Sequence, residues 1–109
     1  MLPKPYWRDM TTVEFEALDP ERTIAVLPIA AIEQHGPHLP VATDAVIGEA
    51  HIERVVELLP SDLGVTFLPV QAVGKSNEHI SSPGTLTLSW DTVTRAWIEI
   101  GESVARAGV

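Results

Sequence analysis

The stretch TIAVLPIAAIEQHGPHLPVATD, residues 23–44, decides the fold. Its first part, Thr23–Ile32, is continuously apolar and bounded by polar residues, which is the pattern of a strand buried on both faces of a parallel sheet. An acid, two histidines and two prolines follow within a few positions. We therefore expect a buried strand whose carboxyl end carries a dense group of proton-transferring and metal-capable side chains.

An amphipathic helix is expected directly after this group. Thr43 is a candidate N-cap, and apolar residues recur at helical spacing as far as Leu59, before Pro60 closes the segment. The expected inward face of this helix comprises Ala45, Gly48, Ile52, Val55, Val56 and Leu59. Acidic residues lie on the opposite side, as on a solvated surface.

The same order of elements then repeats. GVTFLPV, residues 64–70, predicts a second strand, and a second amphipathic helix is expected from a cap at Ser89 to a stop at Gly108. A brief helix near Thr11 or Thr12 precedes the first strand. Strand, helix, strand, helix is typical of α/β proteins with a parallel sheet and right-handed crossovers. We expect a single domain over residues 1–109.

Composition excludes several functional classes. Seven Lys and Arg residues against 15 Asp and Glu residues give a formal net charge of −8, which disfavours nucleic acid and anionic membrane surfaces as partners. The chain has no cysteine, so disulfides and thiolate metal sites are excluded. No apolar run approaches the roughly 20 residues of a membrane span, and the start lacks a signal-peptide pattern. We expect a cytoplasmic protein.

Glu33, His35 and Asp44 form a candidate metal set. Glu33 and His35 are two positions apart at the end of the first strand, so strand alternation would place them on one face, with Gln34 facing the other way. Asp44 lies in the first turn of the helix, where the helix dipole favours a carboxylate. Carboxylates with imidazole suit Zn²⁺ or Mn²⁺. The alternative is a capping Asp, a surface Glu and a His bonded to backbone.

Two separate motifs resemble those of one known family. LPIAAIEQHGPHLPVATD, residues 27–44, is similar to the signature of the creatininase (creatinine amidohydrolase) family, and GKSNEHISSPGTLTL, residues 74–88, is similar to its second signature. Both occur in the family's order. The resemblance implies a three-layer α/β/α fold with a mainly parallel sheet, of which this chain is the amino-terminal part, ending after the second β–α unit.

The resemblance also implies a metal centre and a reaction. Glu33 would bind one metal ion, His35 the other, and Asp44 would bridge them, whereas the family's remaining ligands are absent from these 109 residues. With zinc or manganese, a metal-activated water would hydrolyse a C–N bond of a small, cyclic amide such as creatinine. Ser76 and His38 would contact the substrate. The family resemblance further implies a homo-oligomer.

The leaving nitrogen of such a reaction must be protonated. Glu78 and His79 are the candidate catalytic residues for this step, with loop-anchoring hydrogen bonds as their alternative role. A second function also stays open for the whole chain. Because part of the ligand set is missing, the chain could instead be a catalytically inactive truncated α/β scaffold or an oligomerisation fragment.

Overall fold

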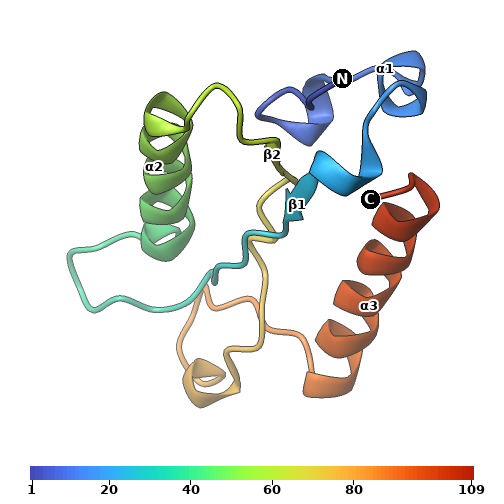
Figure 1. Ribbon diagram of the computed structural model, residues 1–109. Coiled ribbons are helices and arrows are strands. Elements are labelled where there is room, and N and C mark those ends of the chain that lie inside the picture. Colours follow the sequence, from blue (N-terminus) through green and yellow to red (C-terminus); the bar gives the residue numbers. More distant parts are fainter.

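A computed structural model describes residues 1–109 as a pair of parallel strands between helices (Figure 1). β1 (Ile24–Val26) pairs with β2 (Val65–Phe67), with Ile24 opposite Val65. α2 (Thr43–Leu58) and α3 (Trp90–Arg106) lie on opposite sides of the two strands. This helix–sheet–helix layering confirms the predicted α/β class.

The strands are shorter than the apolar runs from which they were predicted. Pro28 and Pro69 follow them closely and have no N–H group to offer to a ladder. The two chains nevertheless stay extended beside each other, since Gln71 N–H donates to the Pro28 carbonyl (2.9 Å) and Ala30 N–H donates to the Gln71 carbonyl (3.0 Å). The parallel arrangement therefore continues as far as the loops that carry the polar motifs.

The amino-terminal residues line the other edge of β2. Phe67 N–H donates to the carbonyl of Pro5 (2.8 Å), and a parallel bridge joins Phe67 to Tyr6. Three short helices follow this contact: η1 (Trp7–Asp9), α1 (Thr12–Glu16) and η2 (Pro20–Arg22). The predicted brief helix is thus confirmed as α1, which Thr11 caps.

α2 differs from its prediction at both a cap and a face. Thr43 is the first helical residue and not the N-cap, because its hydroxyl donates to the carbonyl of Pro40 (2.6 Å) and does not accept from the helix. Val55, predicted to face inward, is 43% exposed. Ala45 is buried as predicted and Val56 is partly buried. One of the residues predicted to face inward on α2, Val55, therefore faces solvent.

α3 follows its prediction closely. Ser89 occupies the N-cap position, and Gly108 adopts φ +89 just beyond the last turn, a backbone conformation that glycine reaches without strain. The predicted inward residues are all buried or partly buried; they are Val93, Ala96, Trp97, Ile100, Val104 and Ala107. A short helix, η3 (Asn77–His79), lies in the loop between β2 and α3.

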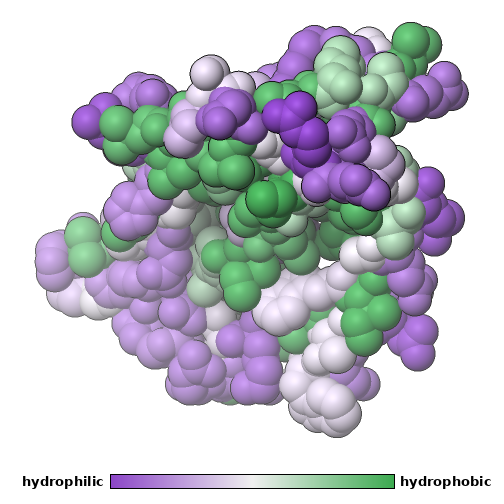
Figure 2. Space-filling view, in the orientation of Figure 1, coloured by the Kyte–Doolittle hydropathy of each residue, from purple (hydrophilic) through white to green (hydrophobic).

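The apolar core is thin, and much apolar surface stays exposed. Ile24 is 51% and Ile29 is 57% exposed, so the prediction of a first strand buried on both faces is wrong for this chain. Figure 2 shows apolar side chains at the surface between the helices, because no element of the 109 residues covers that part of the strand pair. β2 is better covered, because Thr66 and Phe67 are buried, as is Leu68 just after the strand. None of the helices is long and apolar enough to cross a lipid bilayer.

Candidate metal centre

The candidate site lies where the two loops that follow the strands meet. An antiparallel bridge joins Ile32 to Leu86, and Leu86 N–H donates to the Ile32 carbonyl (2.9 Å). Gln34 N–H donates to Oγ1 of Thr85 (3.1 Å), so the next residue of the first loop is also attached to the second. The loops therefore fix each other at the carboxyl ends of the strands, where ligands bind in open α/β sheets.

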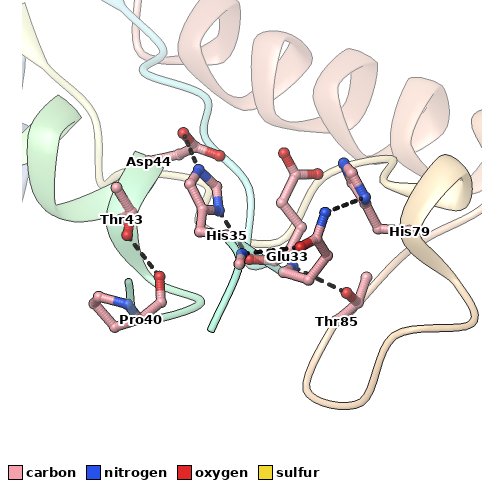
Figure 3. Close-up of polar contacts among 9 residues, drawn as sticks. Glu33, His35, Pro40, Thr43, Asp44, His79 and Thr85 are labelled. Atoms are coloured by element: carbon pink, nitrogen blue, oxygen red, sulfur yellow. Dashed lines mark hydrogen bonds and ion pairs between the residues drawn. The ribbon is translucent and has the colours of Figure 1, made fainter. Parts of the chain in front are cut away.

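His35 and Asp44, two of the candidate ligands, lie in direct contact (Figure 3). Nδ1 of His35 lies 3.0 Å from the carbonyl oxygen of Glu33, and Nε2 lies 3.3 Å from Oδ1 of Asp44. A carbonyl only accepts, so Nδ1 carries a proton and donates it. In a neutral ring Nε2 then presents its lone pair to the Asp44 carboxylate.

A nitrogen lone pair and a carboxylate that face each other repel. A positive charge relieves this repulsion, either as a proton on Nε2 or as a metal ion bound to both groups. The hydrogen bond to the Glu33 carbonyl and then the negative charge of Asp44 raise the pKa of His35, which shows the same preference for positive charge. A metal ion fits equally well. With bonds of about 2.1 Å, two ligands at a tetrahedral angle are roughly 3.4 Å apart, close to the distance between Nε2 and Oδ1.

The local backbone holds this pair in place. Gly36 has φ +77 and begins a tight turn that closes with a bridge between His35 and Leu39. Thr43 ties the start of α2 to the loop through its hydrogen bond to Pro40, and Asp44 comes immediately after it. His35 and Asp44 are therefore presented by a short, closed loop and by the first turn of the helix that follows.

Glu33 lies with a different set of side chains. Ligand atoms of Glu33, Glu78 and His79 all lie within 4.8 Å of one another, and this is the only such group of three among the described residues. Glu33 does not form a group of that kind with His35 and Asp44. The expected strand alternation does not extend this far, because β1 ends at Val26. Glu33 thus approaches the second loop, while His35 approaches α2 (Figure 3).

The two predicted substrate contacts have opposite environments. Ser76 is fully buried, and its hydroxyl has no hydrogen-bond partner. His38 is exposed in the loop before α2 and makes no hydrogen bond to the other site residues. Neither side chain contacts His35 or Asp44 through a polar group.

Gln34 is the site residue that sequence reasoning did not identify. Its side-chain nitrogen lies 3.0 Å from Nδ1 of His79, and its side-chain oxygen accepts from the N–H of Gly36 (2.9 Å). Its partner His79 is 45 positions away, so no local spacing pointed to the contact. The available signal was the place of Gln34 in the sequence, between the candidate ligands Glu33 and His35.

Two surface recesses lie elsewhere on the molecule. One of about 350 Å³ is lined by the amino-terminal segment, α2 and β2, including Tyr6, Arg8 and Glu49. The other, of about 640 Å³, runs along the exposed side of α3. None of the predicted site residues lines either of these two recesses.

Comparison of the sequence with known families and proteins gives a consistent result. The model of a family described as creatininase, creatinine amidohydrolase, matches residues 8–109. The mycofactocin precursor peptide peptidase of Mycolicibacterium smegmatis is 35% identical over 85 residues, covering 76% of this chain and 34% of that protein. The creatinine amidohydrolase of Pseudomonas putida is 29% identical over 106 residues, covering 92% of this chain and 39% of that protein.

Solved structures agree with the sequence comparison. A tryptophan-to-alanine mutant of creatininase superposes with a TM-score of 0.81 at 27% identity, covering 98% of this chain and 42% of the other. A glutamate-to-glutamine mutant of creatininase complexed with creatine gives 0.79. The predicted fold class is thereby confirmed. The chain spans about a third to two fifths of the length of the relatives it matches.

Proposed function

Because this chain belongs to the creatininase family, we propose that it provides the amino-terminal share of a metal-dependent amidohydrolase centre. His35 and Asp44 would hold a zinc or manganese ion, and Glu33 remains a predicted ligand of the same centre. Both relatives named above hydrolyse amides according to their names, one acting on creatinine and the other on a peptide.

The observation that carries the proposal is the orientation of His35. Histidines that bind metals commonly donate their second ring N–H to a carbonyl or carboxylate, which fixes the ring and leaves the other nitrogen free to ligate. Nδ1 of His35 makes such a bond to the Glu33 carbonyl, and Nε2 faces Asp44. The two side chains are 22% and 38% exposed, so an ion can reach them from solvent.

The chemistry divides between the ion and the protein. A divalent ion held by His35 and Asp44 would supply Lewis acidity, which favours a nucleophilic water near neutral pH and polarises an amide carbonyl. His35 and Asp44 bind and orient, and the turn at Gly36 keeps the imidazole facing α2. The substrate class is therefore an amide with an accessible C–N bond, of the creatinine or peptide kind. Completion of the centre by further ligands, including those of a second copy in a homo-oligomer, is part of this proposal.

Metal content per folded chain tests the proposal. The protein is incubated with zinc or manganese, desalted and analysed by elemental mass spectrometry, alongside Asp44→Ala and the matched control Asp62→Ala, an exposed acid in the turn before β2. We expect bound metal in the wild type and in the control, and its loss in Asp44→Ala. A folded wild type without metal would instead favour the inactive scaffold.

A further inference from the structure

The orientation of the Gln34 side chain is fixed by the backbone. Its Oε1 accepts from the N–H of Gly36 at 2.9 Å, and only an oxygen can accept there. The other end of the amide is therefore the NH₂ group. This NH₂ group lies 3.0 Å from Nδ1 of His79.

The amide in turn fixes the protonation of His79. An amide nitrogen donates and does not accept, so Nδ1 of His79 must be the acceptor and carry no proton. In the neutral ring the proton then resides on Nε2. This is the reverse of His35, whose Nδ1 donates to a carbonyl and whose Nε2 is the free acceptor.

The reversed protonation has a consequence for the group formed by Glu33, Glu78 and His79. A metal ion needs an imidazole nitrogen with a free lone pair. Nδ1 of His79 is occupied by the Gln34 amide, and Nε2 carries a proton. The group therefore offers two carboxylates as acceptors and one N–H as a donor, and His79 has no free lone pair for a metal ion. This combination is complementary to an amide, whose N–H donates and whose carbonyl accepts.

We propose that Gln34 is a positioning residue that holds His79 as an Nε2–H donor, so that Glu78 and His79, beside Glu33, form an amide-binding subsite and not a second metal site. The identity of the ligand rests on the proposed function. The protonation of His79 does not, because it follows from the hydrogen bonds of Gln34 alone.

Nitrogen NMR of the ¹⁵N-histidine-labelled chain tests the protonation without any metal. At a pH at which the rings are neutral, we expect Nε2 of His79 to be protonated, Nδ1 of His35 to be protonated, and the exposed His38 and His51 to serve as references. Gln34→Glu keeps the shape but replaces the NH₂ donor by an acceptor, so it should transfer the His79 proton to Nδ1. Wild-type His79 protonated at Nδ1, or a Gln34→Glu variant without a change, would overturn the inference.

Metal content and ligand binding test the role of the group. His79→Ala should keep the metal that Asp44→Ala loses, with His51→Ala as the matched control; loss of metal in His79→Ala would make His79 a ligand and overturn the proposal. Titration with N-acetylglycinamide should shift the His79 Nε2 signal in the wild type and not in Gln34→Glu. An unmoved signal would overturn the amide subsite. If neither the wild type nor any variant binds metal, the proposed function fails, while the protonation of His79 measured by NMR still stands.

Discussion

His35 and His79 are held by hydrogen bonds of opposite sense: Nδ1 of His35 donates to the Glu33 carbonyl, and Nδ1 of His79 accepts from the Gln34 amide. The two rings therefore expose different atoms to the site, a lone pair at His35 and an N–H at His79. Their partners come from adjacent residues of one loop. The same short segment, through Glu33 and Gln34, thus orients His35 as a candidate metal ligand and His79 as a hydrogen-bond donor.

Protons and metal ions compete for Nε2 of His35. Its pKa is raised by the hydrogen bond to the Glu33 carbonyl and by Asp44. A raised pKa in the folded state means that protonated His35 stabilises the metal-free fold below the unfolded pKa, and that this contribution is lost as pH rises through the folded pKa. Metal binding needs the neutral ring, so its affinity should rise over the same interval.

Asp44→Asn separates the contribution of the Asp44 charge to the pKa of His35 from that of the Glu33 carbonyl. It removes the charge but keeps the shape, so we expect the pKa of His35 to fall toward its ordinary value in the metal-free protein. NMR titration of the ring protons measures this, and Glu57→Gln on the exposed side of α2 is the control. An unchanged His35 pKa in Asp44→Asn would contradict the ion pair.

Thr66 and Thr87 give a matched pair of stability predictions. The Thr66 hydroxyl is fully buried in β2 without a partner, whereas Oγ1 of Thr87 accepts from Ser76 N–H (2.8 Å) and donates to Oδ1 of Asn77 (2.8 Å). An unpaired buried polar group costs about 1–3 kcal/mol. Thr66→Val should therefore raise the free energy of unfolding by about 1 kcal/mol, and Thr87→Val should lower it by a similar amount, in urea titrations. Equal effects of the two substitutions would contradict this difference.

The local elements were more predictable than the site geometry. Helical spacing placed the inward residues of α3 correctly, and Gly108 marked its end. The strands were predicted too long because their apolar runs continue past Pro28 and Pro69, where composition still favours a strand but the ladder lacks a donor. Thr43 was misassigned as a cap because the helix begins at Thr43 itself, and its hydroxyl donates to the Pro40 carbonyl and accepts from no helical N–H.

The sequence indicates which residues are candidates for the site but not how they are arranged. The spacing of Glu33, His35 and Asp44 is a local signal, and it correctly indicated that His35 and Asp44 can meet. The approach of Glu33 to Glu78 and His79 depends on how two loops dock across the strand ends. That docking is fixed by long-range bonds such as Gln34 to Thr85, which no spacing in the sequence encodes.

Glu14 provides a test of electrostatics away from the site. Its pKa is lowered first by the hydrogen bond from Lys4 and then by that from the Thr11 backbone N–H. A lowered pKa means that the ionised carboxylate stabilises the fold above the unfolded pKa, and that this contribution is lost as pH falls through the folded pKa. Lys4→Met should raise the pKa of Glu14 in an NMR titration. Lys75→Met, an exposed control, should leave it unchanged.

Gly74 connects the stability of the strand pair to the geometry of the site. A Cβ atom there would lie 2.8 Å from the carbonyl oxygen of Ala30, a backbone atom that cannot move freely because the Ala30 N–H is bonded to Gln71. The Gly74 carbonyl also accepts from Leu88 N–H (3.0 Å). Gly74→Ala should therefore push the two loops apart and lower the free energy of unfolding by about 1–3 kcal/mol.

Gly48→Ala is the matched control for this substitution. Gly48 lies inside α2, and a Cβ atom there would meet nothing within 4 Å. Alanine should stabilise the helix by about 0.5–1 kcal/mol. In Gly74→Ala, but not in Gly48→Ala, the ring nitrogens of His79 should also lose their distinct protonation, because the contact of His79 with Gln34 crosses between the two loops. A Gly74→Ala variant that keeps wild-type stability and the wild-type ring signals of His79 would show that the loops do not depend on this close approach.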